Sequence, residues 1–297
     1  DMAARAVALE QGRALANSFQ ELSVLSKNMN ADLANLAKQE VRDLNIFTSE
    51  LANLNQQIAA MGSTATNSIL DSRDALVDKI CDIVGVTVEL SPAGAAKLTL
   101  GSTGQGPTLV DGINQNNLSV SIADDRLSFA VVKGASQFLT SQVTSGSLHG
   151  VGDAYRTTAE VMREIDNLAF VMVRDMNAVH KQGIDLDGEA GGLLFKALDV
   201  NIQANPTNFG DCIAEAQIID HDALSAEKIV FTYDAEKQIW NGRSDNGSLV
   251  ASGRSSVMLP GLNIGFFGDP VNLDQIILDP IVGSASGVNF ALSRGED

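Results

Sequence analysis

The chain has 297 residues, of which 44% are hydrophobic and 19% charged. This composition is typical of folded globular proteins and excludes an intrinsically disordered chain. Its formal net charge of −17 repels nucleic-acid phosphates and anionic lipid headgroups, so we expect neither nucleic acid nor membrane as a partner. No apolar run reaches the roughly 18 residues of a membrane span, and residues 1–20 lack the basic start and apolar core of a signal peptide.

The first predicted element is a long helix, because neither glycine nor proline occurs between Gly12 and Gly62. Large apolar residues recur there at helical spacing in two runs: Leu15, Phe19, Leu22, Met29, Leu33 and Leu36, then Leu44, Phe47, Leu51, Leu54, Ile58 and Met61. The second run follows the repeat of about 3.5 residues typical of a coiled-coil seam. The offset near Glu40 to Asp43 predicts a stutter or a break, so residues 13–61 form one helix or two. So narrow a stripe needs partner helices from this chain or from neighbouring subunits.

A second helix follows, with Asn67 or Ser68 as its N-cap and Gly85 as a left-handed C-cap. Its apolar face is formed by Ile69, Leu76, Ile80 and Ile83. Cys81 lies beside this face, and we expect both Cys81 and Cys212 to be buried thiols without a disulfide. The group Asp71-Ser72-Arg73-Asp74 predicts a surface helix start with salt bridges, or an Arg73 that anchors the turn between helices through a carboxylate.

The period changes to two from Val86 to about residue 145, which predicts a small antiparallel β unit. The stretch "SGSLHGVGD", which contains His149, is interpreted as a linker to a third helix over about 153–181. The face of that helix consists of Tyr155, Ala159, Met162, Ile165, Ala169, Met172, Met176 and Val179, widened by Leu168, Phe170, Val171 and Val173. Strands return from about 200, with hairpin turns at 234–237 and 245–247.

The order of helices, strands, helix and strands lacks a regular alternation of strand and helix, which argues against a doubly wound parallel sheet. We therefore predict an α+β protein, in which an elongated long-helix bundle, or rod, carries two mainly antiparallel β domains. The predicted divisions are 1–85 for the first part of the rod, 86–146 for a small β unit, 147–200 for the second part of the rod and 201–297 for an outer β domain.

The stretch "NAVHKQGIDLDGEAGGLLF", residues 177–195, raises the question of a metal loop, because Asp185, Asp187 and Glu189 alternate. A calcium loop of the EF-hand kind has its glycine later and a glutamate at its twelfth position, where this sequence has a lysine. We favour a chain reversal in which Gly183 ends the helix, His180 caps helix carbonyls, and 193–195 return to the core.

Other candidate sites are weaker. Asp220-His221-Asp222 supplies two metal ligands or an oriented base only if it lies on a strand face, and a solvated turn is the favoured interpretation. No local motif brings Cys81 or Cys212 to one of the three histidines as a nucleophile pair. Zinc spacings, the P-loop, Gly-x-Ser-x-Gly and the dinucleotide fingerprint do not occur. We predict no catalytic residue, no metal site and no cofactor, hence no enzyme.

Several stretches, taken in order, resemble one family, that of bacterial flagellar hook-associated protein 1. "LDSRDALVDKICDIVGVTV" is similar to its Leu-Asp-x-Arg-Asp-x-Leu core at Leu70, Asp71, Arg73, Asp74 and Leu76. "SGSLHGV" resembles the glycine-rich passage before its second long helix. "MNAVHKQGIDLDGEAGGLLF" resembles its Asn-x-x-His-x-x-Gly-x-Asp-x-x-Gly signature at Asn177, His180, Gly183, Asp185 and Gly188. "IVFTYDAEKQIWNG" and "LPGLNIGFFGDPVNLDQIILDP" resemble its outer β domain.

The resemblance implies a secreted structural protein that forms the junction between flagellar hook and filament and serves motility. Its implied partners are copies of itself in a ring, the hook protein, the second junction protein and an export chaperone. It implies export to the extracellular flagellum through the type III channel without a cleaved signal. We expect a fragment that lacks both terminal helical segments of the family, including the segment that binds the chaperone. The alternatives are flagellin or another axial protein and, from a different class, an extracellular metal-dependent enzyme or adhesin that uses 185–189 or 220–222.

Overall fold

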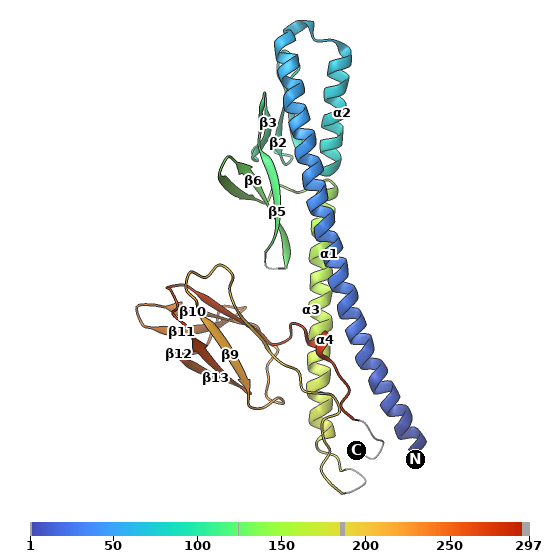
Figure 1. Ribbon diagram of the computed structural model, residues 1–297, viewed down its shortest axis with the longest axis vertical. Coiled ribbons are helices and arrows are strands. Elements are labelled where there is room, and N and C mark those ends of the chain that lie inside the picture. Colours follow the sequence, from blue (N-terminus) through green and yellow to red (C-terminus); the bar gives the residue numbers. More distant parts are fainter. Residues whose placement is uncertain (1, 124, 185–187, 293–297) are drawn as a thin grey trace. The chain divides into compact units, whose positions relative to one another are not determined.

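The computed structural model describes residues 2–123, 125–184 and 188–292, and the chain forms two compact units (Figure 1). One unit consists of residues 1–25 and 161–297, and the other of residues 26–160. Two long helices, α1 (Met2–Met61) and α3 (Ser147–His180), contribute residues to both units. Long helices together with antiparallel sheets confirm the α+β class. The division of the chain at 85, 146 and 200 stays a prediction.

Helix α1 is one continuous helix of 60 residues, which answers the question of one helix or two. The predicted offset near Glu40 is wrong. The buried side chains keep steps of three and four through this region without a break: Ala34, Ala37, Val41, Leu44, Thr48, Leu51, Asn55 and Ile58. A count of large apolar residues misses this seam, because small and polar residues occupy several of its positions. Ala34 and Ala37 allow the packed elements to approach closely. The buried stripe therefore continues through them at steps of three and four, and no stutter is needed.

A 3-10 turn (Gly62–Thr64) leads into α2 (Asn67–Ile83). The cap predictions are wrong: Thr66 is the N-cap and Val84 the C-cap, and Gly85 is not left-handed. Gly85 instead allows close approach, since a Cβ there would lie 1.9 Å from the hydroxyl of Ser145. Of the predicted face, Ile80 is fully buried and the other isoleucines and Leu76 are partly buried.

The unit of residues 26–160 contains two antiparallel sheets, as the change to period two predicted. The first has the order β1-β2-β3-β4, with strands β1 (Val86–Leu90), β2 (Ala96–Leu100), β3 (Thr108–Asp111) and β4 (Asn114–Gln115). The second has the order β5-β6-β7, with strands β5 (Asn117–Ala123), β6 (Arg126–Lys133) and β7 (Ser136–Thr140). One hydrophobic core joins the second half of α1, the end of α2, both sheets and the start of α3. Its fully buried members include Leu44, Leu51, Ile80, Leu98 and Leu148.

Helix α3 starts at Ser147, earlier than the predicted residue 153, so the linker interpretation of "SGSLHGVGD" is wrong. Leu148, Val151 and Tyr155 are buried at helical spacing in this first part. Their burial outweighs the low helix propensity of the glycines between them. The predicted apolar face is also partly wrong, because Leu168, Met176 and Val179 are exposed. The buried stripe passes instead through Asp166, Ala169, Phe170, Val173 and Asn177.

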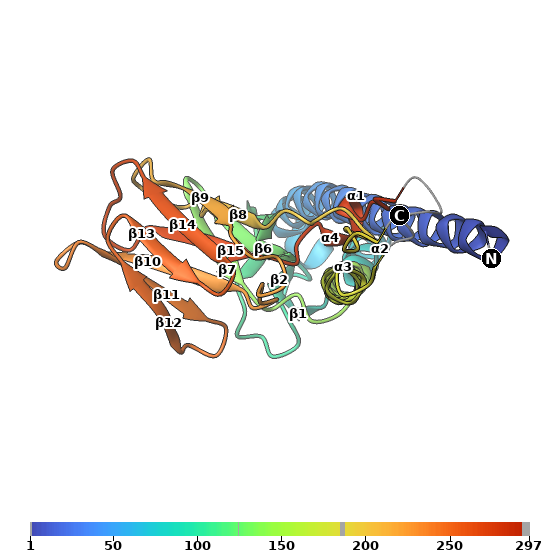
Figure 2. The ribbon, with the colours of Figure 1, turned by 90° about the horizontal axis from the view of Figure 1, so that it is seen from below.

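The unit of residues 1–25 and 161–297 carries two further antiparallel sheets (Figure 2). The larger has the order β12-β11-β10-β15-β8, with strands β8 (Asn201–Ala204), β10 (Ile229–Asp234), β11 (Ile239–Ser244), β12 (Leu249–Gly253) and β15 (Gln275–Asp279). The smaller has the order β13-β14-β9, with strands β9 (Ile213–Ile218), β13 (Ser256–Leu259) and β14 (Leu262–Phe267). A short helix, α4 (Ser284–Gly287), follows. The two predicted hairpins join β10 to β11 and β11 to β12.

The centre of this second core is aromatic. Trp240 stacks on Phe266 with ring centroids 4.8 Å apart, and Phe231 meets Phe266 edge-on at 5.3 Å. Cys212 is buried in the same core, as predicted. Within the described residues, no helix is both long enough and apolar enough to cross a membrane.

Candidate functional site

The stretch 177–195 reverses the chain after α3, as the sequence predicted. The helix ends at His180, not at Gly183, and the Gly183 N–H donates to the carbonyl of His180 at 3.0 Å. Gly191 N–H then donates to Gly183 O at 3.0 Å. A Cβ on Gly191 would lie 2.2 Å from the carbonyl oxygen of His180, so only glycine fits there. Asp185 and Asp187, two of the three candidate calcium ligands, lie outside the described residues.

His180 contacts a different carbonyl from the one predicted. Its Nδ1 lies 2.9 Å from the oxygen of Gly192, in the returning segment, whereas Gly183 takes the carbonyl at the helix end. Asn177 fixes the same segment from inside the core. Its side-chain amide donates to Phe195 O at 2.9 Å, and its oxygen accepts the N–H of Phe195 at 2.8 Å. Both conspicuous polar residues of this stretch therefore hold backbone in place.

The remaining histidines also have structural surroundings. His149 lies in the first turns of α3, and its Nε2 is 3.4 Å from a carboxylate oxygen of Asp153. His221 lies in a turn, as favoured above, and the neighbouring Asp222 forms an ion pair with Lys181 at 3.0 Å. Among the residues that the structure describes, no three His, Cys, Asp or Glu side chains lie together in a way that could hold a metal ion.

Sequence reasoning missed a repeated use of asparagine on the helices. Asn45 exchanges two hydrogen bonds with the backbone of Leu118, both 2.8 Å long. Asn55 does the same with Ala96, at 2.7 and 2.8 Å, as Asn177 does with Phe195. Each amide thus replaces a neighbouring strand, because it offers one donor and one acceptor side by side. The only sequence signal is a polar residue on or beside an otherwise apolar helix stripe.

Buried charges likewise position loops. Asp166 of α3 accepts the N–H groups of Gly283 and Ala285, at 3.0 and 2.8 Å, and so holds the start of α4. Asp279, almost fully buried, pairs with Arg163 at 2.6 Å. Both carboxylates are thus paired or hydrogen-bonded, as buried charges generally are, while the second oxygen of Asp279 has no hydrogen-bond partner among the described residues.

Arg73 matches neither sequence interpretation. It is buried, with 6% of its surface exposed, so this is not a surface helix start. Its Nε and Nη2 donate to one oxygen of Asp74, and its Nη1 donates to Gly94 O at 2.5 Å. The anchored turn is therefore the one between β1 and β2, not the one between the helices. Cys81 is exposed, against expectation, because it lies one residue beyond the buried Ile80 and faces away from the core.

The first half of α1 presents part of its predicted seam to the outside, whereas Phe19 of that seam is buried. In the unit of residues 1–25 and 161–297, Leu15 and Leu22 are 39% and 43% exposed. The part of α1 in the other unit continues the spacing of seven with Met29 and Leu36, at 49% and 42%. Beside Leu15 a groove of about 600 Å³ lies between the start of α1, the end of α3 and the segments around Phe195 and Phe290, and its lining is mainly apolar.

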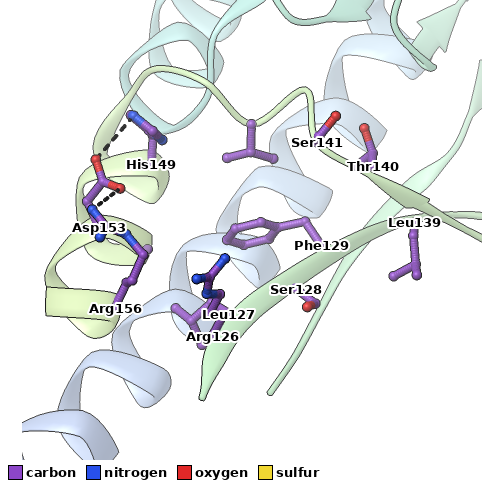
Figure 3. A pocket seen from close by; sticks show the side chains of 12 residues that line it. Arg126, Leu127, Ser128, Phe129, Leu139, Thr140, Ser141, His149, Asp153 and Arg156 are labelled. Atoms are coloured by element: carbon purple, nitrogen blue, oxygen red, sulfur yellow. Dashed lines mark ion pairs between the residues drawn. The ribbon is translucent and has the colours of Figure 1, made fainter. Parts of the chain in front are cut away.

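A second hollow, here named the arginine-rimmed pocket, lies in the unit of residues 26–160 and measures about 330 Å³ (Figure 3). Leu127 and Phe129 of β6, with Val143, give it apolar walls. Arg126 of β6 and Arg156 of α3 lie around it, together with the carboxylate of Asp153. Arg156 already pairs with Glu160 at 2.8 Å and with Asp153 at 3.7 Å. Arg126 is exposed and forms no ion pair with any residue that the structure describes.

Comparison with known protein families and with curated proteins shows what this chain is similar to. The model of the "Flagellar hook-associated protein FlgK helical domain" matches residues 1–195. Flagellar hook-associated protein 1 of Escherichia coli (strain K12) is 26% identical over 294 residues, which cover 95% of this chain and 53% of that protein. The protein of the same name from Bacillus subtilis (strain 168) is 27% identical over 222 residues, covering 65% of this chain and 43% of its own length.

A solved structure shares the fold. The flagellar hook junction protein FlgK from Burkholderia pseudomallei superposes with a TM-score of 0.77 at 24% identity, covering 100% of this chain and 56% of that one. The chain therefore spans about half the length of the relatives that it matches. The family resemblance of the sequence is confirmed, since the helical-domain model alone accounts for well over half of the residues. The chain belongs to the family of the flagellar hook-associated protein FlgK.

Proposed function

We propose that this chain is part of a structural subunit of the bacterial flagellum, located where the hook meets the filament. It acts by packing laterally on copies of itself and axially on its neighbours, and it catalyses no reaction. The proposed neighbours are the hook protein on one side and the second junction protein on the other. The subunit reaches the outside through the flagellar export channel, with an export chaperone as a transient partner, and it needs no cofactor.

The observation that carries the proposal is the open seam on the first half of α1. Leucines at a spacing of seven on a helix are characteristic of a surface that packs on another helix. Leu15 and Leu22 keep about two fifths of their surface exposed within this chain, and the apolar groove beside Leu15 is about 600 Å³. Contiguous apolar surface of this kind is typical of a protein interface.

The charge of the chain supports the same function. A net charge of −17 is compatible with protein partners and unfavourable for nucleic acid or anionic membrane surfaces. The buried polar groups described above hold helices to strands and loops. This supports a rigid subunit whose work is mechanical, although family membership is the stronger argument against catalysis.

The experiment is complementation of a deletion strain with the complete gene. The deletion strain is expected to build hooks, release filament subunits into the medium and fail to swim, and the intact gene should restore swimming. Electron microscopy with an antibody against this chain should label the point where hook and filament meet. Normal filaments in the deletion strain would overturn the proposal.

A matched pair of variants tests the open seam itself. Leu22 and Val24 are both exposed on α1 and point in nearly opposite directions. We expect the Leu22→Lys protein to fold, because the side chain is already partly in solvent, and yet to fail to retain the filament. The Val24→Lys protein should behave like the wild type. Full swimming with Leu22→Lys would contradict a packing role for this face.

A further inference from the structure

An exposed apolar patch lies on two neighbouring loops and on the ends of β9 and β14 next to them, and the function proposed above does not account for it. We name it the Phe209 patch. Its members are 91%, 56%, 50%, 46% and 69% exposed, in the order Phe209, Ile213, Phe267, Val271 and Leu273. Ile213 and Phe267 are directly opposite each other where β9 pairs with β14. A phenyl ring that is nine-tenths exposed carries an unfavourable hydration cost unless a partner covers it.

The patch is held rigidly from beneath. Asp274, 2% exposed, accepts the N–H groups of Phe209 and Gly210 at 2.9 and 3.0 Å and that of Val271 at 2.7 Å. Asp211 accepts the N–H of Asp269 at 2.7 Å, which ties the two loops together a second time. Loops fixed in advance lose little conformational freedom when they bind, so they are suited to docking.

Leu273 adds backbone strain at the same place. Its φ of 72° lies in the left-handed region, which costs a non-glycine residue free energy that the surroundings must offset. The N–H of Leu273 donates to Tyr233 O at 3.0 Å, which holds this conformation, while the side chain remains 69% exposed. Strain that is maintained in order to present an apolar side chain to solvent indicates a binding surface.

The rim of the patch specifies the charge of its partner. Asp211 and Asp269 are both exposed beside Phe209. A complementary surface is therefore an apolar hollow with an unpaired cation at its edge. This chain contains such a hollow in its other unit, the arginine-rimmed pocket of about 330 Å³. Phe129 and Leu127 line it, and the unpaired Arg126 lies at its edge among the residues that the structure describes (Figure 3).

We propose that the Phe209 patch of one copy docks into the arginine-rimmed pocket of the next copy. Phe209 enters the hollow against Phe129, and Asp211 and Asp269 face Arg126. Patch and pocket are different surfaces, so the contact runs head to tail and continues from copy to copy until it closes into a ring or extends as a helix. The inference rests on the proposed function, because assembly at the junction brings the copies together.

The first test is photo-crosslinking in assembled flagella. The complete gene product carries p-benzoylphenylalanine in place of Phe209, and hooks with attached filaments are purified, irradiated and digested. The expected product is a dimer of this protein in which residue 209 is linked to a peptide from 126–156. The matched control carries the same probe at Met258, which is also exposed, at 66%, but lies on β13 outside the patch. It should give no link to 126–156.

The second test reverses charges and keeps the photoprobe as its readout. Asp269→Arg and Arg126→Asp should each lower the yield of the 209 to 126–156 link by at least about tenfold, because each sets like charges opposite one another. The double variant restores opposite charges in every copy and should recover most of the yield. Both residues are exposed, so unchanged thermal unfolding of each single variant will show that the fold is intact.

Location at the junction separates failure of this inference from failure of the proposed function. If antibody labels the junction but residue 209 links to other segments, to another protein or to nothing, the docking proposal is overturned and the function stands. If the double variant does no better than the single variants, the charge pairing is wrong and the proposal is overturned in this form. A protein absent from the junction would overturn both.

Discussion

The two halves of α1 carry the same kind of sequence and have opposite surroundings. In the second half, Leu44, Leu51 and Ile58 are fully buried by α2, the first sheet and the start of α3. In the first half the same register continues as the buried Ala16 and Ser23, whereas Leu15 and Leu22 lie one position before it and stay 39% and 43% exposed. The difference teaches that the first half carries two stripes, one buried within this chain at Ala16, Phe19 and Ser23 and one that this chain leaves uncovered.

Polar contacts follow the same division. The closed second half is tied to strands by Asn45 and Asn55, each with paired hydrogen bonds to backbone. The open first half has Gln20, whose amide donates to the carbonyl of Val288 at 2.7 Å. The closed half thus resembles the interior of a domain, whereas the open half has a lighter attachment on one side only.

The largest effect is expected for Leu51→Ala in the closed half. Removing a fully buried leucine should lower the free energy of unfolding by about 3 kcal/mol, because the transfer and cavity costs add. Leu22→Ala in the open half should cost less than about 1 kcal/mol. Urea denaturation followed by far-UV circular dichroism measures both. Equal losses of stability for the two variants would contradict the comparison, since Leu22 would then be as buried as Leu51.

Trp240 sharpens this experiment, because it is the only tryptophan and lies in the unit that does not contain Leu51. Its fluorescence reports on the unit of residues 1–25 and 161–297, where it is 2% exposed. For Leu51→Ala we expect the circular dichroism transition to move to lower urea and the fluorescence midpoint to move less. A shift of the same size in both signals would mean that the closed half and the outer β region unfold together.

A second pair of substitutions compares the polar contacts. Asn55→Ala leaves the buried backbone of Ala96 without its partners and should cost about 2 to 3 kcal/mol. Gln20→Ala removes a 2.7 Å hydrogen bond to Val288 O and a longer one, 3.4 Å, to Asn289 at a half-exposed side chain, and should cost about 1 kcal/mol. The same urea titrations measure the difference. A Gln20 variant that is as unstable as the Asn55 variant would contradict the lighter attachment of the open half.

Acid should affect the unit that contains the open half through Asp274. Burial by itself would raise the pKa of this carboxyl, but the N–H groups of Val271, Phe209 and Gly210 together lower the pKa below its ordinary value of 3.8. A lowered folded-state pKa gives stability that is present above pH 3.8 and is lost as the pH falls through the folded value. Asp274→Asn should reduce stability at neutral pH and flatten its decline below pH 3.8, measured by Trp240 fluorescence. A variant with the wild-type pH profile would refute this.

The smallest effect concerns the two thiols, one in each unit. Cys81 is an exposed residue. Partial burial of its sulfur and the charges of Asp78 and Asp82 nevertheless raise the pKa of the thiol, which slows its reaction. Cys212 is buried, and burial followed by the charge of Asp274 raises its pKa. A thiol reagent at neutral pH should therefore label Cys81 in the native protein and Cys212 only after unfolding. Rapid labelling of Cys212 in the native protein would contradict this expectation, because it would show that the unit containing Cys212 opens readily.

Much of the fold could be predicted from local pattern. The absence of glycine and proline between Gly12 and Gly62 and the change to period two at Val86 depend on neighbours in sequence, and both gave the right elements. The chain reversal after α3 was predictable for the same reason, since its glycines are visible in the sequence, and the structure shows that Gly191 leaves no room for a Cβ beside the carbonyl of His180. Such features need no knowledge of distant contacts.

The remainder depends on tertiary burial. Leu148 and Val151 start α3 in spite of Gly150 and Gly152, because the core rewards their burial more than the glycines weaken the helix. In the sequence, Asn55 interrupts the apolar stripe of α1. In the structure its amide forms two hydrogen bonds to the backbone of Ala96, as a neighbouring strand would. The Phe209 patch was invisible for a further reason: exposure of an apolar residue is a property of the folded surface, and the sequence pattern of a loop does not report it.

The paired hydrogen bonds between Asn45 and Leu118 have one more consequence. Strand β5 lies at the margin of its sheet, and margins of this kind readily recruit foreign strands and seed fibres. Because a helix side chain already occupies both backbone groups of Leu118, an incoming peptide finds no vacancy at that position. Backbone-to-backbone growth from this margin is therefore blocked at Leu118.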